Sequence, residues 1–133
     1  MTEVPQHAID DAALVLQSAL SGDSDAVVGT FDSVVDRRGM AAAYDVAWHL
    51  AGEMVGGDTM HGPWRLDFPG IDDATYDARW VARFVSAYVN DDASTATALF
   101  TVALVDGRLP ECLLTQAGST VATLRRRATI GPA

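Results

Sequence analysis

The chain has 133 residues, of which 49% are hydrophobic, and a formal net charge of −9 at pH 7. This length predicts a single domain over residues 1–133, which can bury a core without disulfides or a metal. The hydrophobic content excludes disorder of the whole chain. The negative charge argues against gripping phosphate backbones or anionic membranes, so we expect neither nucleic acid nor a membrane as a partner.

Cysteine usage and the N-terminal segment indicate where the protein works. Cys112 is the only cysteine, so an internal disulfide is impossible and a reducing compartment is expected. Residues 1–11 lack a basic region followed by an apolar run, so we predict no signal peptide and a cytoplasmic location. All nine basic residues are arginine. Arginine without lysine is typical of GC-rich genomes such as those of actinobacteria, or of salt-adapted proteomes.

Helical periodicity predicts three helices in the first half of the chain. The first runs over 9–20 after a loose tail, and Gly22 ends it as a left-handed cap. The second begins after Asp23 or Ser24 and ends at Gly39, and the third runs over about 40–55. The three predicted core faces comprise Ile9, Ala12, Ala13, Leu16 and Leu20; Val27, Val28, Phe31, Val34 and Val35; and Ala43, Val46, Ala47, Leu50, Ala51 and Met54.

A loop over 57–73 separates these helices from three more. Its length is unusual inside a compact domain and is often functional. The helix predicted over 76–90 carries Tyr76, Trp80, Phe84 and Tyr88 at a spacing of four, which places them in one stripe. Because its apolar arc is so wide, we expect this helix to lie at the centre of the fold. Helices over about 93–105 and from Pro110 to about residue 128 complete the chain, and we expect Leu99, Phe100, Ala103 and Leu104 to lead the apolar face of the fifth.

The predicted fold is therefore all-α, a compact bundle of about six helices. The order of three helices (8–56), a long loop (57–73) and three helices (74–128) suggests an internal duplication. A shift of 69 residues pairs Asp23 with Asp92 and Phe31 with Phe100, and a shift of 70 pairs Val35 with Val105. Because helical hairpins resemble one another, the duplication and a chance likeness both stay open.

One side of the predicted third helix carries residues that could bind a metal. Asp45, His49 and Glu53 follow at i, i+4 and i+8, so nitrogen and oxygen ligands point the same way. His61, in the loop just downstream, could complete the site together with Asp58. The alternative is a solvated polar face, because this side lies opposite the predicted core.

The central loop holds the most distinctive candidates for contact with a partner. Trp64, Arg65 and Phe68 belong to residue types that dominate interface energetics, and neighbouring prolines and glycines restrict the loop. The alternative is that the two aromatic side chains cover the bundle. Trp48 falls near the polar side of its predicted helix, which suggests a partner or dimer surface, or a boundary position.

The sequence contains no arrangement typical of catalysis or cofactor binding. Cys112 has no histidine implied beside it, and phosphate loops and dinucleotide turns are absent. We predict a non-catalytic interaction or regulatory protein without a cofactor, which binds a protein partner or forms a homodimer. Two alternatives are a metal-binding protein or metal-dependent enzyme using Asp45, His49 and Glu53, and an acidic decoy that occupies a nucleic-acid site on another protein.

Overall fold

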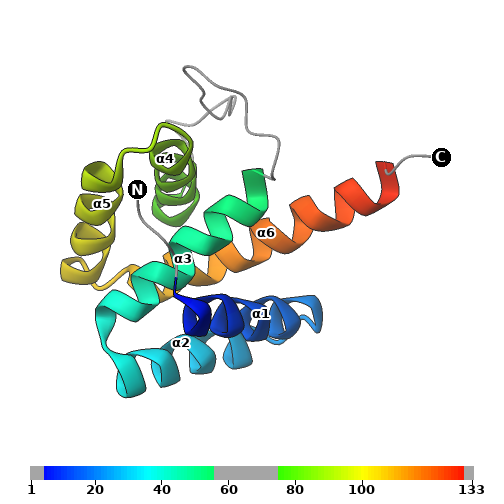
Figure 1. The fold of residues 1–133 in the computed structure, drawn as a ribbon, viewed down its shortest axis with the longest axis horizontal. Coiled ribbons are helices and arrows are strands. Elements are labelled where there is room, and N and C mark those ends of the chain that lie inside the picture. The colour runs from blue at the N-terminus through cyan, green and yellow to red at the C-terminus, as the bar shows by residue number, and fades with distance from the viewer. Residues whose placement is uncertain (1–4, 56–74, 131–133) are drawn as a thin grey trace.

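A computed structural model of the chain describes residues 5–55 and 75–130, and within these ranges it forms six helices and no strand. This confirms the predicted all-α bundle (Figure 1). The predicted loop over 57–73 lies outside the described residues. None of the described helices is both long and apolar enough to cross a lipid bilayer. The helices are α1 (Gln6–Leu20), α2 (Ser24–Arg38), α3 (Met40–Val55), α4 (Tyr76–Val89), α5 (Ala93–Val105) and α6 (Leu109–Ile130).

The turn between α1 and α2 recurs between α4 and α5, at an offset of 69 residues. Asp23 accepts a hydrogen bond from the backbone N–H of Ala26 at 3.0 Å, and Asp92 accepts one from Thr95 at 3.1 Å. The preceding residues adopt left-handed backbone, with φ of 72° at Gly22 and 54° at Asp91. Both turns therefore end one helix and cap the next in the same way.

Burial repeats with the same offsets. In the second helix of each half the buried pairs lie 69 residues apart, and in the third helix they lie 70 apart, as the sequence shift predicts. The two halves thus share one packing register, which supports a structural repeat. The matched buried positions are Val27 and Ala96, Phe31 and Phe100, Val34 and Ala103 in α2 and α5, and Ala42 and Cys112, Ala43 and Leu113, Val46 and Gln116, Ala47 and Ala117, Leu50 and Thr120, Ala51 and Val121 in α3 and α6.

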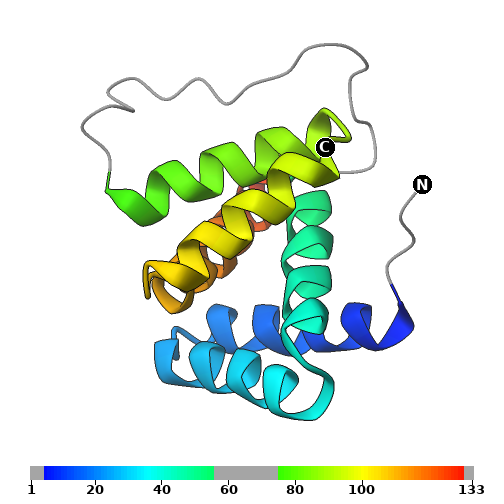
Figure 2. The ribbon, with the colours of Figure 1, turned by 90° about the vertical axis from the view of Figure 1, so that its left-hand side faces the viewer.

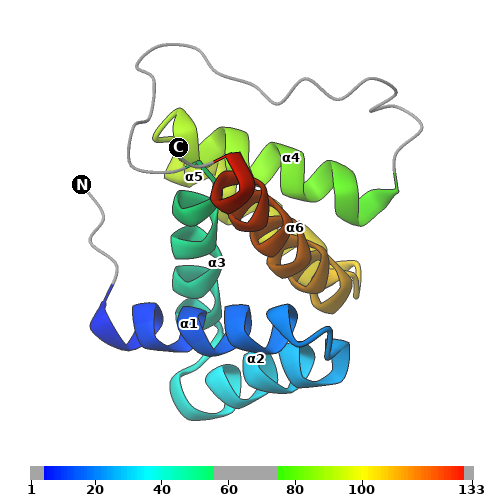
Figure 3. The same cartoon turned by 90° about the vertical axis from the view of Figure 1, so that its right-hand side faces the viewer.

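The centre of the fold is the crossing of α3 and α6 (Figures 1 and 3). Helix α6 contacts every other helix, while α3 packs against α1, α2, α4 and α6. Ala47 and Ala117 are fully buried, and the Gln116 side chain donates from Nε2 to the Ala47 carbonyl at 2.8 Å. Small side chains let the two helices approach closely. The expectation that the helix over 76–90 is central is therefore wrong.

Helix α4 instead packs its aromatic stripe against α3, α5 and α6. Trp80 stacks on Phe84 with ring centroids 4.7 Å apart, and Tyr88 meets Trp48 of α3 edge-on at 4.9 Å. The indole nitrogen of Trp80 donates to the Leu99 carbonyl of α5 at 2.9 Å. The stripe is thus a packing surface between helices, as its spacing predicts.

The face that α1 buries differs from the predicted one. The helix begins at Gln6, and its buried residues are Ala8, Asp11, Ala12 and Val15, whereas Ala13 and Leu20 are exposed. Asp11 is only 5% exposed, and its carboxylate lies 3.5 Å from Arg37 and 3.8 Å from Arg38 of α2. An ion-paired aspartate therefore takes a core-facing position that a pattern of apolar residues does not reveal.

Candidate interaction surface

The outer side of α5 is an apolar surface without charge. The segment Ala93–Val105 contains no charged residue. The helix packs mainly on α4 and more lightly on α6, and Figure 2 shows it on the outside of the bundle. Val102 is 53% exposed and Val105 79% exposed, and with Ala98 they form a stripe at i, i+4 and i+7. We call this the α5 stripe.

A hollow borders the α5 stripe on the side of α4. It has a volume of about 180 Å³ and is lined by Arg79 and Arg83 together with Trp80, Leu99 and Val102. Arg83 is exposed and Arg79 half-buried. Basic side chains therefore flank the stripe here without lying on it.

A larger groove opens on the other flank of α5, where the two halves of the chain meet. Its volume is about 400 Å³, and its walls come from α2, the start of α3, the end of α5 and the start of α6. Val35 and Leu104 line it as equivalent positions of the two halves, as do Ala43 and Leu113. The complete lining is Val28, Phe31, Asp32, Val35, Asp36, Met40, Ala43, Leu104, Leu109, Pro110 and Leu113.

Leu104 differs from its prediction. The sequence pattern places it with Phe100 and Ala103 on the core face of α5, yet it is 44% exposed at the groove. Because α5 is apolar on all sides, periodicity alone does not show which side is buried. The absence of charge along the whole helix is the signal that could have identified both the groove wall and the α5 stripe.

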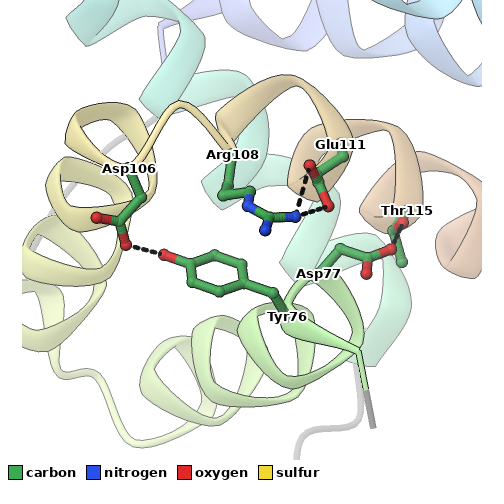
Figure 4. Close-up of polar contacts among 6 residues, drawn as sticks. All are labelled: Tyr76, Asp77, Asp106, Arg108, Glu111 and Thr115. Carbon is green, nitrogen blue, oxygen red and sulfur yellow. Dashed lines mark hydrogen bonds and ion pairs between the residues drawn. The ribbon is translucent and has the colours of Figure 1, made fainter.

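A polar cluster fixes the turn that joins α5 to α6 (Figure 4). The Tyr76 hydroxyl donates to Asp106 at 2.8 Å, and the Arg108 guanidinium lies over the Tyr76 ring, 5.6 Å from its centroid. Arg108 also pairs with Glu111 at 3.3 Å. One turn further along α6, Thr115 donates to the Asp77 carboxylate at the start of α4. These contacts hold the turn between Leu104 and Leu109, and so position one wall of the groove.

The titratable groups of this cluster are tuned for structure. Hydrogen bonds from the Thr115 and Thr75 hydroxyls hold the pKa of Asp77 below its usual value. The hydrogen bond to Asp106, with burial and the negative charge of that carboxylate, raises the pKa of Tyr76. Burial and the nearby Glu111 and Asp77 raise the pKa of the Cys112 thiol to about 12, so it stays protonated at neutral pH. A protonated, buried thiol is a poor nucleophile.

The structure brings together two of the predicted metal ligands. His49 Nε2 lies 3.4 Å from Glu53 Oε1. Asp45 is a turn earlier on α3, where burial raises its pKa and the charge of His7 partly offsets the shift. Within residues 5–55 and 75–130, no group of three or more His, Cys, Asp or Glu side chains is arranged to hold a metal ion. His61 lies outside the described residues.

The predicted partner-binding residues are divided between the core and the central loop. Trp48 is only 6% exposed and packs among Tyr44, Phe84 and Tyr88, so the expectation that it lies near the polar side of its helix is wrong. Tyr44 and Trp48 fill the space between α3 and α4, which widens the core face of α3 beyond its alanine stripe. Trp64, Arg65 and Phe68 lie outside the described residues.

Comparisons with protein-family models, with curated proteins and with solved structures find no match to this chain.

Proposed function

We propose that this protein is a small, non-catalytic interaction module that forms a homodimer through the α5 stripe. The exposed, charge-free side of α5 is the observation that carries the proposal. A helix that is apolar on every side is normally buried, yet α5 is covered by only α4 and α6. A second molecule packed on the stripe would remove Val102 and Val105 from water.

A second copy of the same chain suits this surface for an electrostatic reason. In a twofold dimer a patch packs against its own copy, so any charge near the axis faces an identical charge. The chain carries a net charge of −9, and most of its surface would repel another copy. The α5 stripe is free of charge, and it lets two acidic molecules meet without opposing carboxylates at the centre of the contact.

The size of the surface sets the expected strength. A helix of 13 residues is about 20 Å long and about 10 Å across with side chains. This is less than the ~800 Å² per partner that stable complexes usually bury. We therefore expect a reversible dimer that dissociates on dilution. A reducing compartment such as the cytoplasm suits a chain whose only cysteine is a buried thiol.

Light scattering coupled to size exclusion, over a wide range of protein concentration, tests the proposal. The wild type should move from the monomer mass towards twice that mass as concentration rises. The Val102→Asp/Val105→Asp variant should remain a monomer throughout, because it places two like charges at the centre of the contact.

The matched control is Leu14→Asp/Leu20→Asp, which adds the same charge at exposed leucines of α1. It should dimerise like the wild type. A wild type that is monomeric at every concentration would refute the dimer. Equal loss of dimer in both variants would refute the assignment to α5.

A further inference from the structure

The groove between the two halves has a closed, apolar floor. Phe31, Ala43 and Leu113 are each no more than 5% exposed, and Leu104 forms an exposed wall. The volume of about 400 Å³ falls in the range that accommodates a small ligand or a few large side chains. The floor is built from both halves, and the polar cluster around Tyr76 and Arg108 holds the turn beside it. The groove is therefore part of the folded bundle.

The charge of the groove has one sign. Asp32 and Asp36 line it from α2, one helical turn apart, and both are exposed. Among the described residues, neither carboxylate has a hydrogen-bond or ion-pair partner. The next two residues, Arg37 and Arg38, reach instead to Asp11 of α1. Two carboxylates four residues apart on a helix repel each other, and a cation placed between them would relieve that repulsion.

We infer that the groove binds a basic amphipathic segment of another protein. The segment would place one or two large apolar side chains on the floor of the groove. Arginine or lysine residues one helical turn apart would then pair with Asp32 and Asp36. This is the geometry of a helix lying in a groove, where apolar anchors give affinity and flanking charges select the partner. The inference uses a different surface from the α5 stripe and does not depend on dimerisation.

Fluorescence anisotropy with a defined peptide tests the inference. The probe is a short labelled helix with leucine on one face and two arginines, one turn apart, beside it. Asp32→Asn/Asp36→Asn should weaken binding about tenfold, which is the combined effect of two favourable exposed ion pairs. The affinity of the wild type should also fall as salt is added.

Two controls separate the groove from general attraction to an acidic protein. The Asp10→Asn/Asp91→Asn variant removes the same charge at exposed positions away from the groove, and it should bind within about twofold of the wild type, since distant exposed charges are screened. A probe with glutamine in place of arginine should bind weakly. The inference is overturned if no probe binds, if both variants weaken binding equally, or if the glutamine probe binds as well as the arginine probe.

The same titration on the Val102→Asp/Val105→Asp variant keeps the two proposals distinct. Binding of the arginine probe should persist there. A monomeric wild type that still binds the probe through Asp32 and Asp36 would remove the dimer and keep the groove, and a dimer that ignores the probe would do the reverse.

Discussion

At the scale of single residues, the hydrogen bond from Thr115 to Asp77 ties the start of α4 to α6. It is also the largest cause of the lowered pKa of Asp77. A carboxyl group whose pKa is lower in the folded state stabilises that state above its unfolded pKa. This stabilisation disappears as pH falls through the folded pKa. The contact therefore strengthens the fold at neutral pH and not in strong acid.

We predict that Thr115→Val lowers the free energy of unfolding at neutral pH by about 1 kcal/mol or less, because the bond is only partly shielded from water. Urea unfolding of both proteins at neutral pH and at about pH 3 measures the difference, which should shrink in acid. The Asp92 carboxyl also has a lowered pKa, but it contributes equally to both proteins. A difference that grows in acid would contradict the assignment.

At the scale of elements, the contact between α3 and α4 depends on a glycine. A Cβ at Gly52 would lie 2.7 Å from the Tyr88 hydroxyl oxygen and 3.1 Å from the ring carbon that bears it. The Tyr88 ring also packs against Trp48, with centroids 4.9 Å apart, so it has little room to move. Gly52 is thus needed for close approach of the two helices, although glycine is a poor helix former.

We predict that Gly52→Ala lowers the free energy of unfolding by about 1 kcal/mol, because overpacking outweighs the gain in helix propensity. In the Tyr88→Phe background the hydroxyl is gone, and the same substitution should cost less. Chemical denaturation of the two single variants and the double variant gives this coupling. Independent, additive effects would show that the hydroxyl does not limit the approach.

How far the sequence predicts an element depends on whether its two sides differ. In α2, apolar and charged residues alternate with helical period, and Val27, Phe31 and Val34 are buried as expected. In α5 every side is apolar or small, so the length of the helix could be predicted but not its exposed side. In α1, the partners of Asp11 come from another helix, and such pairing cannot be read from local periodicity.

The site follows the same limits. The absence of charge in Ala93–Val105 is visible in the sequence, but its meaning depends on α5 lying outside the bundle. The groove requires residues about 70 positions apart to meet, such as Val35 and Leu104. The sequence shift predicts that these positions are equivalent, and only the packing of α3 across α6 shows that they line one groove. The loop residues Trp64, Arg65 and Phe68 stay predictions.

At the scale of the whole molecule, the two halves interlock. Helix α1 packs against α6 of the other half, and α4 packs against α3. Neither half can therefore bury its own apolar faces alone, and we expect the halves to unfold together.

We predict a single unfolding transition when far-UV circular dichroism and tryptophan fluorescence are followed in urea. A Trp64→Phe background leaves Trp48 to report on the first half and Trp80 on the second, and both indoles are buried. Further replacement of either tryptophan by phenylalanine separates the two signals. Two transitions at different urea concentrations would show that the halves are independent units.

The most direct test of the central claim is cross-linking from the α5 stripe. Cys112 is buried and its pKa is raised to about 12, so an introduced surface cysteine would be the main reactive thiol. Ala98→Cys lies in the middle of the stripe, and Ser33→Cys, exposed on α2, is the matched control. With a short thiol cross-linker at a concentration where the wild type is dimeric, the account predicts a covalent dimer from Ala98→Cys and little from Ser33→Cys. Equal cross-linking of the two variants, or cross-linking of Ser33→Cys alone, would contradict a dimer built on α5.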